Sequence, residues 1–84
     1  MNLLFTPEAW EDYLYWQTHD KKLLKKINTL IKEIKRTPFE GTGKPEPLKH
    51  ILQGCWSRRI NHEHRLVYEV FEERIHIISC RYHY

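Results

Sequence analysis

The chain has 84 residues, of which 40% are hydrophobic and 30% are charged, as is typical of one globular domain. A domain of this size buries only about 60 to 65% of the surface that its unfolded chain exposes, so we expect no deep pocket. The net charge of +3, from 14 Lys and Arg against 11 Asp and Glu, permits a polyanionic partner without requiring one. No apolar run approaches the roughly 20 residues of a membrane span, and the first residues do not resemble a signal peptide, so we expect a cytoplasmic protein without membrane contacts.

The first part of the chain predicts a strand followed by an aromatic helix. Residues 2–6 form a short apolar run. Thr6-Pro7-Glu8 then indicates a helix start, because a Thr hydroxyl can cap a helix and Pro fits its first turn. We expect this helix to end near Thr18. Its large side chains exceed what one buried stripe needs, which makes part of them a candidate interface; they are Trp10, Tyr13, Leu14, Tyr15 and Trp16.

A second helix is the clearest structural prediction. Asp20 can cap its start, and Pro38 ends it because proline disfavours helical geometry at the preceding residue. The helix separates an apolar face from a lysine face, and a lysine face is usually solvated. The apolar positions are Leu23, Leu24, Ile27, Leu30, Ile31 and Ile34, and the opposite face carries Lys21, Lys22, Lys25, Lys32 and Lys35.

Residues 37–47 predict a loop of functional length, because they are rich in Pro and Gly and lack periodicity. Glu46 lies between Pro45 and Pro47. The two prolines restrict the backbone on either side of Glu46, so its carboxylate can take few positions.

The remainder predicts an antiparallel meander, with strands at 55–60, 65–71 and 74–82 and a tight turn at Glu72-Glu73. Residues 48–52 fit either a strand or a single helical turn. Together the elements predict an α+β fold in which two N-terminal helices pack on a small antiparallel sheet. The last strand would carry Arg81-Tyr82-His83-Tyr84 into that sheet, and a docked chain end can hold functional groups.

The hairpin around residues 61–64 admits two registers. A four-residue loop puts Arg65 on the face of Arg58, whereas a bulge favours Arg59 as its neighbour. The sequence does not choose between them.

Other chemistries have weak support. Cys55 and Cys80 lie in apolar strand-like runs, so we expect both thiols to be reduced and buried, without a catalytic role. The run His62-Glu63-His64, like Cys80 with His83, does not supply the four ligands of a structural zinc site. We therefore expect no metal site. The sequence contains no glycine-flanked nucleophile, which disfavours catalysis by Ser or Cys. It also contains no phosphate-binding loop, so we expect no nucleotide cofactor.

The remaining polar residues suit metal-independent cleavage of RNA. Transesterification needs a base for the 2′-hydroxyl, fixed positive charge for the phosphorane, and an acid for the 5′-oxygen. These requirements match a carboxylate at Glu46, an imidazole at His83, and cations at Lys49, Arg58, Arg59, Arg65 and Arg81. The residues alone leave two alternatives open: a catalytically silent RNA-binding or ribosome-binding module, and a protein-protein adaptor that uses the aromatic helix.

Several stretches together resemble the YoeB/Txe family of toxins, which belongs to the RelE superfamily of bacterial type II toxin-antitoxin systems. The resemblance runs from end to end of the chain. The stretches that carry it are Trp10-Glu11-Asp12-Tyr13-Leu14-Tyr15-Trp16, Lys25-Lys26-Ile27-Asn28, Gly43-Lys44-Pro45-Glu46-Pro47-Leu48-Lys49-His50, Trp56-Ser57-Arg58-Arg59-Ile60, Glu63-His64-Arg65-Leu66-Val67-Tyr68 and Tyr82-His83-Tyr84.

The resemblance implies a microbial-RNase-like fold and a ribosome-dependent mRNA endonuclease, an mRNA interferase that cleaves mRNA in the A site of the 70S ribosome. It implies that Glu46 is the general base, that His83 is the general acid and that Arg65 stabilises the transition state. It assigns phosphate contacts to Lys49 and Arg59 and substrate positioning to Tyr84.

The resemblance also implies partners. A YefM-type antitoxin would neutralise the toxin, and operator DNA would be contacted only through that antitoxin. The toxin itself would form a homodimer and meet ribosomal RNA on its target.

Overall fold

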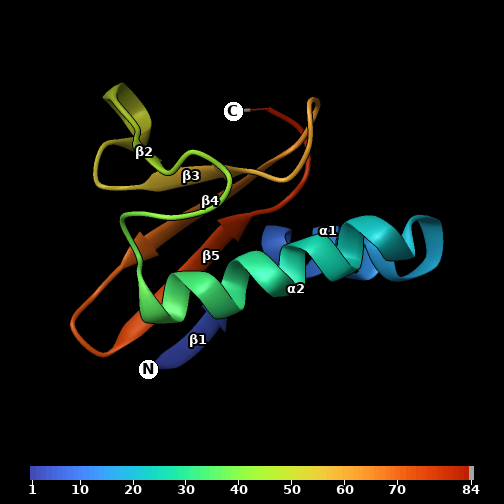
Figure 1. The fold of residues 1–84 in the computed structure, drawn as a ribbon, viewed down its shortest axis with the longest axis horizontal. Helices are drawn as coiled ribbons and strands as arrows, with labels where there is room; N and C mark the ends of the chain where they lie inside the picture. Colours follow the sequence, from blue (N-terminus) through green and yellow to red (C-terminus); the bar gives the residue numbers. More distant parts are fainter. Residues whose placement is uncertain (84) are drawn as a thin grey trace.

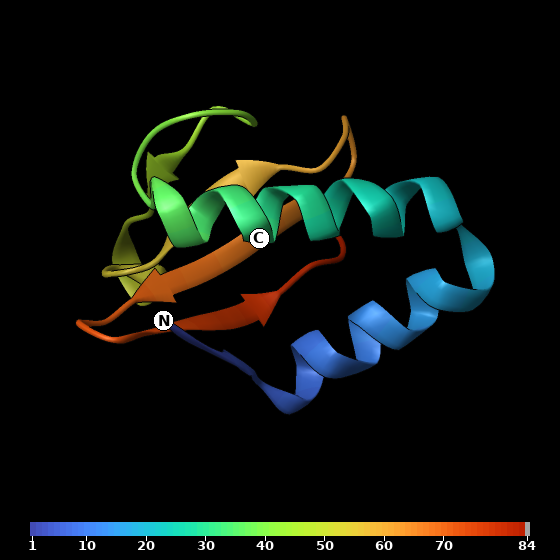
Figure 2. The ribbon, with the colours of Figure 1, turned by 60° about the horizontal axis from the view of Figure 1, so that its bottom comes forward.

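The structure, a computed structural model, describes residues 1–83 as two helices and one five-stranded sheet (Figure 1). The strand order is β1-β5-β4-β3-β2, and Figure 2 shows α2 lying across one face of this sheet. The elements in chain order are β1 (Asn2–Phe5), α1 (Pro7–His19), α2 (Lys21–Arg36), β2 (Glu46–Pro47), a 3₁₀ turn η1 (His50–Leu52), β3 (Trp56–Arg59), β4 (Arg65–Val70) and β5 (Arg74–Ser79).

The α+β prediction is confirmed, with one difference in the sheet. Strands β2 to β5 pair antiparallel, but β1 runs parallel to β5. Most of the chain lies between these two strands, so no short turn forces them to be antiparallel. The sheet is therefore mixed at one edge.

The two helices form a hairpin that depends on polar caps. Thr6 Oγ1 accepts the Ala9 N–H at 3.0 Å at the start of α1, as its position before Pro7 predicts. Asp20 ends α1 and begins α2, where its Oδ1 accepts the N–H groups of Lys22 and Leu23, each at 3.1 Å. A single residue thus reverses the chain between the helices.

Two hydrophobic clusters lie on opposite faces of the sheet. The larger one joins the helices to side chains such as Leu66, Tyr68 and Ile77, all of which are fully buried. The smaller one contains Val67, which alternates with Leu66 and Tyr68 along β4 and therefore projects to the other face. The helices cover the first face, and β2 and η1 lie beside the second.

The predicted strand ends differ where side chains redirect the backbone. β5 ends at Ser79 instead of Tyr82, because Trp16 Nε1 donates to the Cys80 carbonyl at 2.9 Å and the Cys80 N–H donates to Asp12 Oδ2 at 3.0 Å. These bonds draw the chain toward α1.

Two short elements fall within stretches that the sequence left as loop or ambiguous. Residues 46–47 form the edge strand β2, where Pro47 is tolerated because an edge strand can lack a donor. Of the two alternatives for residues 48–52, the helical turn is the one observed. Both cysteines are free and buried, as predicted. Within residues 1–83, no helix has the length and apolar character of a bilayer span.

Candidate active site

The register of β2, β3 and β4 places polar residues on the sheet face away from the helices. Glu46 pairs with Ser57, and Arg59 pairs with Arg65. Directly opposed residues share a face, and so do residues two apart on one strand. Glu46, Arg59 and Arg65 therefore project to the same side of the sheet.

This register also decides the hairpin question. Arg59 is the neighbour of Arg65, while Arg58 pairs with Leu66 and projects toward the helices. Of the two adjacent arginines, Arg59 is exposed and Arg58 is fully buried. Arg58 therefore does not belong to the candidate phosphate-binding cations.

Buried Arg58 holds the loop that leads to Glu46. Its Nε donates to the Tyr68 hydroxyl at 3.2 Å. One terminal nitrogen, Nη1, donates to Glu33 Oε1 at 2.8 Å and to the Thr42 carbonyl at 3.1 Å. The other, Nη2, donates to the carbonyls of Thr37 and Glu40. All five N–H groups of the guanidinium are used, which compensates for the cost of burying its charge.

Gly43 completes this connection. The Arg59 N–H donates to the Gly43 carbonyl at 2.7 Å, so the loop lies directly against β3. Gly43 has a φ of +88°, and a Cβ there would lie 3.0 Å from the Arg59 carbonyl oxygen. Glu46, three residues later, is therefore positioned by a buried network as well as by its flanking prolines.

Glu33 makes the stability of this network depend on pH. The backbone N–H of Thr42, then the Thr42 side chain and then Arg58 hold the pKa of the Glu33 carboxyl below its ordinary value of 4.5. A lowered pKa stabilises the fold above the unfolded-state value, and this contribution is lost as the pH falls through the folded-state value.

We expect Glu33→Gln to flatten the acid side of the stability profile. Wild type should lose free energy of unfolding progressively below about pH 4.5, and the variant should lose less over the same range while being less stable near pH 7. Urea denaturation between about pH 2.5 and 7 measures this. Glu11→Gln, at an exposed site on α1, is the control, and an unchanged acid slope in Glu33→Gln would contradict the assignment.

The second half of the candidate site is the clamped chain end. The Tyr82 N–H donates to His64 Nδ1 at 2.8 Å, and the Arg65 N–H donates to the Tyr82 carbonyl at 3.0 Å. Both backbone groups of Tyr82 are thus fixed to the β3–β4 hairpin, and Tyr82 has a φ of +67°. His83 follows this clamp directly, beside the start of β4.

Side chains of α1 support the same segment. The Arg81 guanidinium lies 3.5 Å from the centroid of the Tyr15 ring, so Arg81 packs on α1. Burial raises the pKa of Asp12, and its bond from the Cys80 N–H partly opposes that shift. Burial, with a smaller contribution from the Asp12 charge, raises the pKa of the Cys80 thiol to about 12. A thiol of this kind is not a nucleophile at neutral pH.

Arg65 is held by its own hairpin. Its Nη1 donates to the carbonyls of Asn61, His62 and His64 at 2.8, 3.4 and 3.1 Å. The turn is itself ordered, because Asn61 Oδ1 accepts the N–H of His64 at 2.8 Å. These bonds orient the guanidinium before any substrate arrives.

Lys49 lies at the β2 side of this face. It is exposed and lines a hollow of about 300 Å³ together with Glu46, Pro47, Leu48, His50 and Leu52. The hollow adjoins the smaller hydrophobic cluster through Leu48. No trio of His, Cys, Asp or Glu side chains in residues 1–83 is placed to hold a metal ion.

The chain matches a known protein family over almost its whole length. The family model of the YoeB-like toxins of bacterial type II toxin-antitoxin systems matches residues 5–84. This chain belongs to that family. Toxin YoeB of Escherichia coli K12 is 63% identical over 84 residues, which is 100% of both chains.

Solved structures of the YoeB family share the fold. A YoeB/ParE toxin from Agrobacterium tumefaciens has a TM-score of 0.97 and 52% identity, with 100% of both chains covered. A YoeB dimer from Staphylococcus aureus has a TM-score of 0.94 and 59% identity. The heterotetrameric YoeB-YefM complex of that organism gives 0.92 and 59%; both comparisons cover 100% of this chain and 98% of the other.

Of the site residues expected from the sequence, the sheet register brings Glu46, Arg59 and Arg65 to one face, and the clamp places His83 next to the β3–β4 hairpin. Lys49 lies beside Glu46. Tyr84 lies outside the described residues. The sequence did not predict the positioning contacts of Arg58, His64, Asp12 and Trp16.

Proposed function

We propose that this toxin is an mRNA endonuclease that acts on the ribosome, in the A site, and so inhibits translation and growth. The observation that carries the proposal is the shared face of Glu46 and Arg65, with the chain end clamped to the Arg65 backbone. A carboxylate, fixed cations and a neighbouring imidazole are the groups that metal-independent RNA transesterification needs.

In the proposed reaction, Glu46 removes the proton of the ribose 2′-hydroxyl, and the 2′-oxygen attacks the adjacent phosphorus. The bond from phosphorus to the 5′-oxygen breaks, and His83 gives a proton to the departing oxygen. The products are a 2′,3′-cyclic phosphate, or the 3′-phosphate formed by its hydrolysis, and a 5′-hydroxyl. Since the RNA supplies its own nucleophile, no metal or cofactor takes part.

The cations have distinct places in this proposal. Arg65 stabilises the additional negative charge of the phosphorane, because its guanidinium is already oriented by the hairpin carbonyls. Arg59 and Lys49 hold phosphates on the same side of the sheet. Tyr84 positions the substrate.

End-group analysis of RNA cleaved in a translating extract tests the proposal. We expect primer extension to locate cuts within translated codons, and the upstream fragments to end in cyclic or 3′-phosphate. Glu46→Gln should slow cleavage by about 10²- to 10⁴-fold, the usual effect of removing a general base. Fragments with a 3′-hydroxyl and a 5′-phosphate would refute the mechanism, and the absence of any fragments would favour a silent binding module.

The partners follow from the family. We propose that a YefM-type antitoxin neutralises the toxin, on the model of the S. aureus YoeB-YefM complex, and that the toxin forms a homodimer like the S. aureus YoeB. Trp10 is 47% exposed and its ring stacks on Tyr13, which makes α1 a candidate surface for one of these proteins. Operator DNA would be contacted only through the antitoxin, and the ribosomal target places the toxin in the cytoplasm.

A further inference from the structure

The positive charge of this chain is concentrated on one helix. Within its 16 residues, α2 carries seven Lys and Arg against one Glu, a net charge of +6. The whole chain has a net charge of +3, so the other 68 residues together carry −3. The basic character of the protein is therefore a property of α2.

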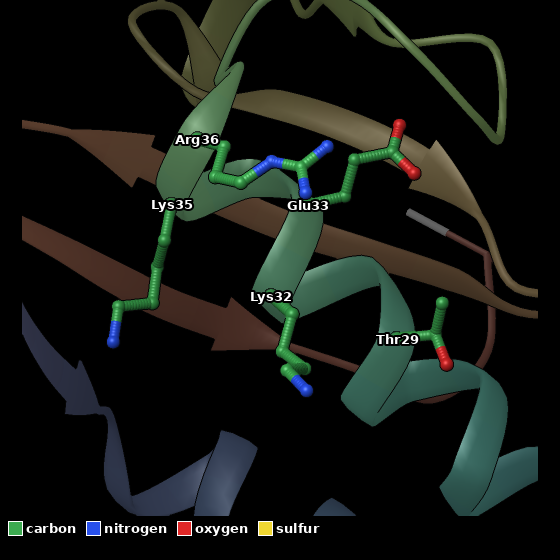
Figure 3. Close-up of a pocket in the computed structure, with 5 residues that line it drawn as sticks. All are labelled: Thr29, Lys32, Glu33, Lys35 and Arg36. Carbon is green, nitrogen blue, oxygen red and sulfur yellow. The ribbon is translucent and has the colours of Figure 1, made fainter.

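The cations form an outward row. Lys22, Lys25, Lys32 and Arg36, which we call the α2 stripe, are all exposed and lie at helix positions i, i+3, i+10 and i+14. This spacing keeps them on the side opposite the buried residues of α2 and extends over about 21 Å. Figure 3 shows Lys32 and Arg36 with Thr29 around a hollow of about 520 Å³ on this surface.

The arrangement is unfavourable for an isolated helix. Lys22 and Lys25 are three residues apart and Lys32 and Arg36 are four apart, so cations face cations along the surface. After the Asp20 cap, the first turn has Lys21 and Lys22 and no acid, so one carboxylate faces two cations at the positive end of the helix dipole. Solvated helices usually alternate the two signs of charge.

The helix's own carboxylate does not relieve this repulsion. Glu33 is the one acid of α2, and it binds the buried Arg58 at 2.8 Å and the Thr42 N–H. Glu33 also lines the hollow beside Lys32 and Arg36, but its printed bonds go to Arg58 and to the loop backbone. Local arrangements that oppose stability are expected where a ligand compensates for them.

We propose that the α2 stripe binds the sugar-phosphate backbone of ribosomal RNA, which rests on the proposed ribosomal function. α2 covers the sheet face opposite to the one that carries Glu46 and Arg65, so RNA on the stripe is not the strand being cut. A backbone contact needs spaced cations and no apolar centre. The stripe fits this description better than it fits a protein, because protein interfaces centre on apolar or aromatic side chains.

A charge-removing variant tests the proposal. In Lys22→Gln/Lys25→Gln/Lys32→Gln, affinity for purified 70S ribosomes should fall roughly 10- to 100-fold, and the magnitude of the slope of log affinity against log salt should fall by about 2 to 3, as expected for three lost phosphate contacts. The matched control, Lys22→Arg/Lys25→Arg/Lys32→Arg, should retain both values. The melting temperature of the Gln variant should equal or exceed that of wild type, because like-charge repulsion is removed.

The outcomes separate the two proposals. If wild type binds ribosomes but leaves translated mRNA intact, the proposed function fails while the stripe is still tested by binding. If wild type cleaves and the Gln variant matches it in ribosome affinity and salt slope, the stripe proposal is overturned. A Gln variant that loses a YefM-type antitoxin but keeps ribosome affinity would show that the stripe serves a protein instead.

Discussion

Ending the chain after Tyr82 should abolish mRNA cleavage and leave the fold intact. Both backbone groups of Tyr82 are bonded to the β3–β4 hairpin, and Trp16 and Asp12 hold Cys80. These four contacts all lie before residue 83 and remain in the shortened chain. Removing His83, the proposed general acid, should cost about 10²- to 10⁴-fold in rate, and single-turnover cleavage on programmed ribosomes would measure the loss.

A second variant separates the imidazole from the chain end. Full-length His83→Gln should reduce the cleavage rate by a comparable factor. The melting temperature and the affinity for the antitoxin should stay close to the wild-type values for both variants. Unchanged cleavage by the truncated chain would refute the acid assignment. A large fall in melting temperature would instead show that the last residues support the fold.

The helices were predictable because local chemistry determines them. Thr6 caps α1 and Asp20 caps α2, and in each case the capping side chain comes just before residues with helical hydrophobic spacing. Pro38 follows the end of α2. The end of β5 was not predictable in this way. Trp16 and Cys80 are distant in sequence, and the bond between them ends the strand early.

For Arg58 and Arg59, the sequence pattern indicates which side chain is buried but not which groups it binds. Strand alternation requires neighbours to face opposite sides, so one arginine had to face the helices. Trp56 and Ile60 have the parity of Arg58, and this was a usable signal for its burial. Its five hydrogen-bond partners were not predictable, since they come from α2, β4 and the loop at 37–42.

The candidate site depends on both kinds of information. Glu46 and His83 stood out as residue types in restricted segments, and the resemblance assigned their roles. Their supports, His64 for the chain end and Gly43 for the loop, depend on contacts across the sheet. Such contacts follow from the register of the β3–β4 hairpin. The sequence left that register undecided, because either Arg58 or Arg59 could share a face with Arg65.

The same substitution should therefore affect different properties at Arg58 and at Arg59: stability at Arg58 and cleavage at Arg59. Arg58→Met removes the donor shared by the Thr37, Glu40 and Thr42 carbonyls, and we expect it to cost about 3 to 5 kcal/mol in the free energy of unfolding. For a domain of this size that corresponds to a fall in melting temperature of at least about 12 °C. Thermal and urea unfolding measure the effect.

Arg59→Met is the matched control, because it makes the same change one residue away on the other face. Arg59 is exposed, so its loss should change stability by no more than about 0.5 kcal/mol while weakening cleavage if it holds a phosphate. Equal stability losses in the two variants would contradict the assignment of Arg58 to the loop network. Because Arg58 acts on Glu46 only through that loop, Arg58→Lys should also lower the cleavage rate at temperatures where it remains folded.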